Sequence, residues 1–166
     1  MSTRLFGKPI KRNEDPRLLT GQAQFVDDVH LPGMLHIAFV RSAYAHARLA
    51  AIDTQAARAL PGVIAIYLAE DLGEYWQPGP LLVPPPPIKD LLFNPRTQLP
   101  LAKGKVRHAG EPIAVIVAES RYIAEDAAQL VVVDYEPLSA IVALEDALKP
   151  DAQLVHEDLP QNLNAH

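Results

Sequence analysis

The sequence predicts a mixed α/β (α+β) domain in which two main helices pack on a mixed sheet. A strand, a short alanine-rich helix and a second strand follow one another at 47–67, and this succession recurs at 113–136. Residues 113–118 are continuously apolar, which is typical of a strand covered on both faces. The 166 residues fit one domain, and 49% apolar residues supply a core for it.

The first succession follows a turn at Pro32 and Gly33. Asp53 occupies a helix N-cap position, because its carboxylate can accept the free N–H groups of a first turn. Pro61 disfavours helical geometry in the residue before it, and Gly62 permits a reversal of the chain. The expected elements are a strand at 34–40, a strand at 47–52, a helix at 53–60 and a strand at 63–67.

The second succession contains the stronger helix signal. Ser120 can cap a helix over 120–130, and the apolar side chains of this helix share one face. We expect this helix and the one at 53–60 to pack on a sheet that includes 113–118 and 131–136. The residues of the apolar face are Ile123, Ala124, Ala127 and Leu130.

The chain divides by composition into an arm at 1–16, a domain at 17–142 and a tail at 143–166. The domain contains a proline-rich insertion at 73–104, which we expect to cross the domain or to touch a neighbouring chain. Binding of these prolines to an SH3-type groove is the alternative. The apolar side chains of 76–93 and of the tail from Leu154 to Leu163 predict a surface that another chain covers.

Composition excludes several classes of function. A net charge of −5 gives no electrostatic reason to expect nucleic acid or an anionic membrane surface as a partner. The absence of cysteine excludes disulfides, thiolate catalysis and Cys-ligated metal centres in this chain. The longest apolar run is far shorter than the ~20 residues that span a bilayer. The first residues also lack the apolar run of a signal peptide, so we expect a cytoplasmic location.

A search for chemical motifs assigns no catalytic, cofactor-binding or metal-binding residue. The 6 histidines have none of the spacings that place two imidazoles on one metal ion. The segment at 103–105 lacks the spacing of a phosphate-binding loop. The acidic pairs Asp27-Asp28 and Glu70-Asp71 are adjacent in sequence, which favours turn residues and caps over an acid/base pair.

Three polar residues have structural interpretations. His36 lies in an apolar strand and is expected to be a hydrogen-bonded core or edge residue. His46 stands between alanines and could anchor a turn by bonding backbone carbonyls. Arg41, next to Ser42, is the best candidate for a specific polar role, and a structural salt bridge is the role we expect.

The order of seven short motifs resembles one family. The match runs from about residue 7 to residue 164, and it looks like the N-terminal α/β-hammerhead domain of the molybdopterin-binding large subunit of the aldehyde oxidase/xanthine dehydrogenase family. Aerobic carbon monoxide dehydrogenase large subunits belong to this group. The motifs are Leu19-Thr20-Gly21, Phe25-Val26-Asp27-Asp28, Gly33-Met34-Leu35-His36, Arg41-Ser42-Ala43-Tyr44-Ala45-His46-Ala47, Pro61-Gly62-Val63, Val106-Arg107-His108-Ala109-Gly110-Glu111-Pro112-Ile113-Ala114 and Val133-Asp134-Tyr135-Glu136-Pro137-Leu138.

The resemblance implies a molybdenum hydroxylase that acts on aldehydes, purines, other N-heterocycles or carbon monoxide at a molybdenum–pterin centre. Electrons would leave through iron–sulfur and flavin subunits. The family's pterin-binding loops and catalytic glutamate belong to downstream domains, so no catalytic residue and no cofactor ligand is carried over to this chain. The cofactor is expected in a partner or in the missing domains, and the substrate stays open.

The resemblance therefore implies a structural or assembly domain without a complete active site, part of an oxidoreductase and not catalytic alone. Its expected partner is a pterin-binding chain of the same enzyme. A separately encoded subunit and a fragment of a longer chain are both compatible with these residues. The alternative from another class is a free-standing protein-binding module that uses the proline-rich insertion.

Overall fold

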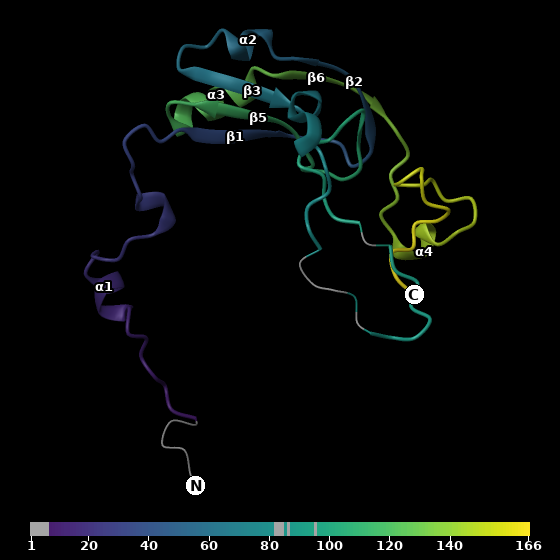
Figure 1. Ribbon diagram of the computed structural model, residues 1–166, viewed down its shortest axis with the longest axis horizontal. Helices are drawn as coiled ribbons and strands as arrows, with labels where there is room; N and C mark the ends of the chain where they lie inside the picture. The colour runs from purple at the N-terminus through teal and green to yellow at the C-terminus, as the bar shows by residue number, and fades with distance from the viewer. Residues whose placement is uncertain (1–6, 82–84, 86, 95) are drawn as a thin grey trace. The chain divides into compact units, whose positions relative to one another are not determined.

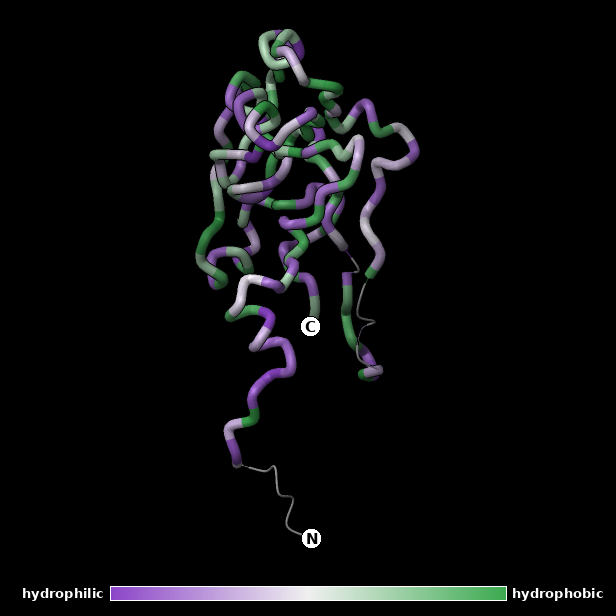
Figure 2. The backbone as a smooth tube through the Cα atoms, turned by 90° about the vertical axis from the view of Figure 1, so that its left-hand side faces the viewer, coloured by the Kyte–Doolittle hydropathy of each residue, from purple (hydrophilic) through white to green (hydrophobic). Residues whose placement is uncertain are grey.

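The computed structural model describes residues 7–81, 85, 87–94 and 96–166. The contacts divide the chain into two units, Met1–Met34 and Leu35–His166. The first unit contains the helix α1 (Asp15–Leu19) and the short 3₁₀ helix η1 (Val26–Asp28), and neither buries a residue. In Figure 2 this segment is coloured mostly as hydrophilic, so its sequence offers little that could build a core of its own.

Two three-stranded sheets form the framework of the second unit (Figure 1). In both sheets every pair of named strands is antiparallel. The first sheet has the order β1-β5-β3, with β1 (His36–Arg41), β5 (Pro112–Ala118) and β3 (Val63–Leu68). The second has the order β4-β2-β6, with β4 (Lys105–Val106), β2 (Ala47–Asp53) and β6 (Val132–Pro137).

The mixed α/β class is confirmed, and so is a central position for the apolar strand β5, which pairs on both edges. The expectation that 113–118 and 131–136 share one sheet is wrong, and the single mixed sheet is replaced by two antiparallel ones. The reason is that β6 forms its backbone ladder with β2 and not with a strand of the first sheet. Strand pairing is a long-range choice that apolar periodicity does not specify.

The two expected helices are present with different lengths. Helix α3 (Arg121–Gln129) begins after Ser120, whose hydroxyl accepts the N–H of Ile123 at 3.3 Å, so the predicted cap is confirmed. Helix α2 (Gln55–Arg58) is shorter than the expected 53–60. Asp53 lies one residue before its N-cap, where the carboxylate still accepts the N–H of Gln55 at 2.8 Å.

Helix α2 starts later than expected because Asp53 still belongs to β2, where it pairs with Val132, and it ends at Arg58. After it, Gly62 has φ +87°, a left-handed conformation that reverses the chain into β3. The elements that the sequence pattern did not reveal are short. They are α1, η1, β4, η2 (Ala69–Tyr75) and α4 (Leu144–Ala147).

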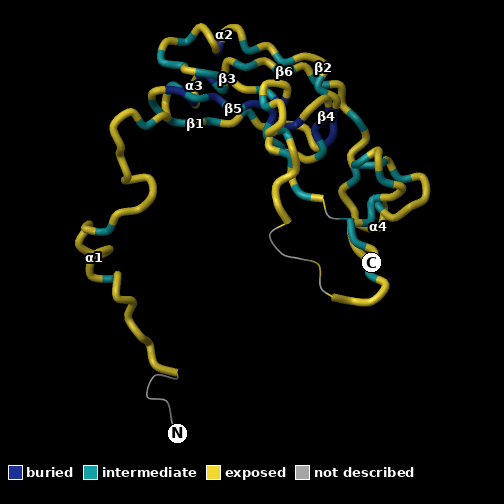
Figure 3. The backbone as a smooth tube through the Cα atoms, in the orientation of Figure 1, coloured by how far each residue is buried: buried dark blue, intermediate teal, exposed yellow. Residues whose placement is uncertain are grey.

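Two apolar clusters hold the second unit together, and β5 contributes to both (Figure 3). The first lies between the β1-β5-β3 sheet and the helices α2 and α3, where small alanine side chains permit close packing. The second cluster belongs to the β4-β2-β6 sheet. The first contains Ala57, Ile66, Ala114, Ile116, Ala118, Ala124 and Ala127, and the second Ala47, Ala102, Val106 and Ile113.

Candidate functional site

The proline-rich insertion and the C-terminal tail lie against each other. Leu92 and His166 exchange two backbone hydrogen bonds of 2.9 and 3.0 Å, and the backbone N–H of Asn94 donates to the carbonyl of Asn164 at 2.8 Å. The Asn94 side chain adds a bond to the carbonyl of Leu163 at 2.7 Å. Two segments that are distant in sequence thus form one structural piece, visible in Figure 1 as the teal and yellow chains near the C-terminus.

This pairing covers part of the apolar surface expected at 76–93, and part of it stays exposed. Leu81, Ile88 and Leu92 remain 41%, 61% and 45% exposed, but the side chains of Trp76 and Phe93 are half-buried. The indole N–H of Trp76 donates to the carbonyl of Leu101 at 2.9 Å, which fixes the start of the insertion to the domain. Leu82, Val83, Pro84, Pro86 and Pro95 lie outside the described residues.

A cleft of about 500 Å³ lies where the insertion, the β4–β5 connection and the tail meet. Charged side chains dominate its surroundings. Nζ of Lys105 donates to Oε1 of Glu157 at 2.8 Å, although the Lys105 side chain is only 7% exposed. Arg96 also pairs with Asp158, and Oε1 of Glu111 lies 3.9 Å from Nη1 of Arg107. Oε2 of Glu111 lies 3.8 Å from Nδ1 of His108.

The electrostatics of this cleft favour a structural role. Burial lowers the pKa of His156 from its usual 6.5, and the nearby guanidinium of Arg96 lowers it further. The hydrogen bond and charge of Lys105 lower the pKa of Glu157 from its usual 4.5. Among the described residues, each of these three cations faces a carboxylate, so their charges are engaged in ion pairs within the protein.

A second polar cluster surrounds the turn between β1 and β2. The hydroxyl of Ser42 donates to the carbonyl of Tyr44 at 2.8 Å and accepts the backbone N–H of the same residue at 3.0 Å. The backbone N–H of Ser42 donates to the carbonyl of Glu111 at 2.9 Å, and Gly110 donates to the carbonyl of Ser42 at 2.8 Å. The buried Ser42 therefore joins the β1–β2 turn to the turn before β5.

His46 anchors this turn as the sequence predicted. Its Nδ1 lies 2.7 Å from the carbonyl oxygen of Ser139, which can only accept a hydrogen bond, so Nδ1 carries a proton and donates it. The backbone N–H of Leu138 donates to the carbonyl of His46 at 2.9 Å. The ring is only 6% exposed, and Nε2 has no hydrogen-bond partner among the residues that the structure describes.

The prediction of a salt bridge for Arg41 is wrong for the described part of the chain. Its Nη1 donates to the carbonyl of Gly110 at 2.9 Å, and its guanidinium lies 5.2 Å from the ring centroid of Phe39. The edge position predicted for His36 is confirmed, because it begins β1 at one side of the sheet. Neither side chain joins a cluster able to do chemistry.

The acidic pairs contain the predicted caps. The carboxylate of Asp28 accepts the N–H of Phe25 at 2.9 Å, and that of Asp71 accepts the N–H of Leu68 at 2.7 Å. These bonds satisfy free N–H groups at the starts of η1 and η2. Within residues 7–81, 85, 87–94 and 96–166, three or more His, Asp or Glu side chains nowhere gather in a way that could hold a metal ion.

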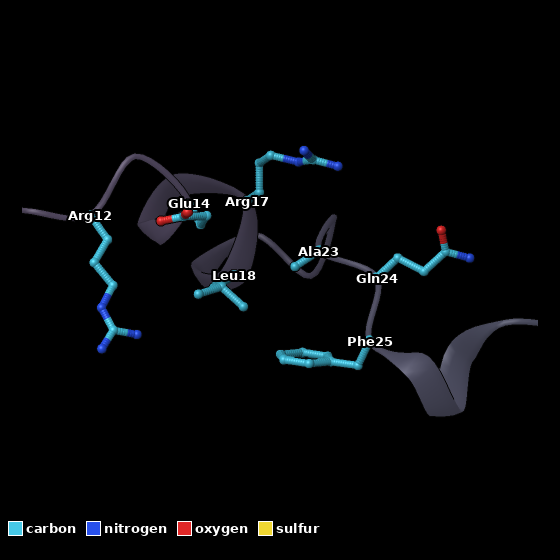
Figure 4. A pocket seen from close by; sticks show the side chains of 7 residues that line it. All are labelled: Arg12, Glu14, Arg17, Leu18, Ala23, Gln24 and Phe25. Carbon is cyan, nitrogen blue, oxygen red and sulfur yellow. The ribbon is translucent and has the colours of Figure 1, made fainter. Parts of the chain in front are cut away.

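The N-terminal unit has a concave surface of its own, lined by residues of α1 and of the turn after it (Figure 4). The guanidinium groups of Arg12 and Arg17 point in different directions there, so they do not converge on one ligand. Nothing in this arrangement resembles a chemical site. The helices in the described ranges are all too short or too polar to cross a membrane.

Comparison with known proteins gives a consistent result. Residues 20–139 match the family model described as aldehyde oxidase and xanthine dehydrogenase, a/b hammerhead domain. The chain is 45% identical over 153 residues to the carbon monoxide dehydrogenase large chain of Afipia carboxidovorans, covering 92% of this chain and 18% of that one. It is 35% identical over 146 residues to the xanthine dehydrogenase molybdenum-binding subunit of Escherichia coli, covering 83% of this chain and 18% of the relative.

A solved structure of a protein with a related name also matches this fold. The fold matches quinoline 2-oxidoreductase from Pseudomonas putida 86 with a TM-score of 0.81 and 42% identity, over 95% of this chain and 19% of that chain. The sequence thus spans about a fifth of the length of the proteins that it matches.

Proposed function

This chain belongs to the aldehyde oxidase and xanthine dehydrogenase family through its a/b hammerhead domain, and we propose that it is a structural and assembly domain of a molybdenum hydroxylase. In this proposal residues 17–142 form the hammerhead domain, and 143–166 lead toward the pterin-binding part of the enzyme. The chain contributes architecture, and it is not catalytic alone.

The observation that carries the proposal is that the positive side chains around the cleft are paired with negative ones of the same chain. Arg96 of the insertion and Lys105 of β4 each pair with a carboxylate of the tail, and Arg107 faces Glu111 within the β4–β5 connection. The same segment occurs in relatives whose names refer to carbon monoxide, xanthine and quinoline. A segment shared by enzymes named for such different substrates supports a common architectural task.

The described residues do not fit a molybdenum centre of their own. They provide no cluster of metal-binding side chains, and the whole chain lacks cysteine. One relative is named as a molybdenum-binding subunit, and four fifths of its length lie outside the match. We therefore place the molybdenum–pterin cofactor in a pterin-binding chain of the same enzyme, with iron–sulfur and flavin subunits completing a cytoplasmic complex.

The test is co-expression of this chain with the Afipia carboxidovorans large chain from which the matching segment has been removed. We expect the two to co-purify, with molybdenum in the complex and none in this chain purified alone. The relative's own matching segment, supplied in the same way, is the positive control. Stoichiometric molybdenum retained by this chain alone after gel filtration would contradict the proposal.

A further inference from the structure

Among the described residues, two buried side-chain nitrogens have no hydrogen-bond partner within the protein. They are Nε2 of His46, in the turn between β1 and β2, and Nε of Arg107, in the β4–β5 connection. Buried polar groups are nearly always paired, because an unpaired one has lost its bonds to water without replacement. Each of these two nitrogens therefore needs a physical explanation.

Both side chains line the same cavity, which has a volume of about 150 Å³. Four segments that are distant in sequence meet there, namely the β1–β2 turn, the β4–β5 connection, the chain just after β6 and the tail. The volume exceeds the roughly 10–15 Å³ that one water molecule needs. Two unpartnered nitrogens on one cavity point to an occupant that forms hydrogen bonds.

The two nitrogens have opposite hydrogen-bonding roles. Nδ1 of His46 donates to the carbonyl of Ser139, so Nε2 of the neutral ring is an acceptor. Nε of Arg107 carries a hydrogen and can only donate. Elsewhere on the same guanidinium, Nη1 donates to the carbonyl of Lys105 at 3.3 Å. The cavity thus offers one acceptor and one donor that nothing else in the described chain uses.

This combination selects a hydroxyl group over an ion. A simple anion would place its lone pairs against Nε2 of His46, and a metal cation would be repelled by the guanidinium of Arg107. A hydroxyl group donates through its hydrogen and accepts through its oxygen, so it satisfies both nitrogens. Water is the most abundant molecule of this kind. His108, Ser139 and Gln153 also line the cavity, and their polar groups supply the further partners that a buried water requires.

We propose that this cavity is a binding site for ordered water, which donates to Nε2 of His46 and accepts the N–H of Arg107 Nε. The water connects the β1–β2 turn with the β4–β5 connection, in addition to the direct backbone bonds that Ser42 makes between the two turns. The site is a property of this chain alone, so it is independent of the proposed function.

Nuclear magnetic resonance of the ¹⁵N-labelled chain tests the site directly. Cross-relaxation between the water signal and the Nε–H of Arg107 is measured in the laboratory and rotating frames, because the sign of the rotating-frame peak separates dipolar contact from proton exchange. We expect the peak of a long-lived water at Arg107, and an Nε2 resonance of His46 displaced upfield from that of an unbonded acceptor. The Nε–H of Arg58 is the control and should show no such peak, because it already donates to Oγ1 of Thr54 at 3.0 Å.

Two variants show which groups hold the water. In His46→Asn the amide nitrogen replaces Nδ1 as a donor to the carbonyl of Ser139, but nothing replaces Nε2. We expect the water peak at Arg107 to weaken several-fold in this variant. Ser139→Ala keeps the carbonyl and removes a hydroxyl that lines the cavity. This variant should retain the peak, which excludes a signal relayed by exchange through that hydroxyl.

The other outcomes overturn the proposal. In the unmodified chain these are no dipolar water peak at Arg107, or an Nε2 resonance of His46 that is unbonded or protonated. A peak that keeps its full intensity in His46→Asn shows that the water is not held by His46, and a peak lost in Ser139→Ala shows that it was relayed. If His46→Asn does not fold, the two measurements on the unmodified chain decide. None of these results affects the proposed function.

Discussion

Lys105 and Glu157 are 52 residues apart in sequence, yet Nζ of the lysine donates to Oε1 of the glutamate at 2.8 Å. The lysine side chain is 7% exposed and the glutamate 60%, so the pair reaches from the buried strand β4 to the surface of the tail. A buried ammonium without a partner is strongly unfavourable, so this pair is a polar attachment that ties the tail to strand β4.

Lys105→Met should loosen the tail. Methionine keeps the apolar stem but removes the donor to Glu157, so we expect amide hydrogen exchange at 154–158 to become several-fold faster. The matched control is Lys149→Met, because Lys149 and Asp146 form a pair in which both side chains are more than half exposed. Exposed pairs contribute little, so this variant should leave exchange unchanged. Equal exchange in the two variants would show that the Lys105–Glu157 pair does not hold the tail.

The stability of the second unit should fall in weak acid because of His156. Its pKa is lowered by burial and by Arg96, so the unfolded chain binds the proton more readily than the folded chain. The contribution of His156 is therefore present above pH 6.5, its usual pKa, and is lost as the pH falls through the lowered value. Denaturant unfolding between pH 7 and 5 measures this loss, and His156→Gln should reduce it. A flat profile for the unmodified protein would contradict the assignment. Glu157 acts in a separate window, below its usual pKa of 4.5.

Gly62→Ala should destabilise the domain more than Gly104→Ala. Both glycines have positive φ, +87° and +67°, which costs a residue with a Cβ roughly 1–2 kcal/mol. At position 62 the new Cβ would also lie 2.7 Å from Cδ1 of Ile123, whereas at 104 no atom lies within 4 Å. The free energies of unfolding of the two variants isolate the effect of the close contact with α3. An equal loss would mean that Ile123 rotates away without cost.

Ile116→Ala tests the first apolar cluster. Ile116 is fully buried between the sheet and the helices, and its truncation should lower the free energy of unfolding by about 2–5 kcal/mol. Val132→Ala, at a residue that is 60% exposed on β6, is the control and should change it by less than about 0.5 kcal/mol. Similar losses at both positions would show that burial on β5 does not dominate stability.

Local patterns were sufficient to place most secondary structure. The apolar run of 113–118, the cap at Ser120 and the stop at Pro61 and Gly62 all lie where the sequence predicts. These features depend on a few neighbouring residues and their backbone preferences, so a single sequence contains them. Predictions failed where a distant residue decided the outcome, as with the role of Arg41, which bonds a carbonyl 69 residues away.

The sequence by itself determined the α/β class, the positions of the main strands and helices, and the family motifs. Tertiary structure alone decided that β6 pairs with β2, that Lys105 is buried against Glu157, and that Phe39 lies on an uncovered face beside Val115. The physical reason is that periodicity tells which side chains avoid water but not which surface covers them. Coverage depends on strand register and on contacts between segments far apart in the chain, and both are properties of the folded state.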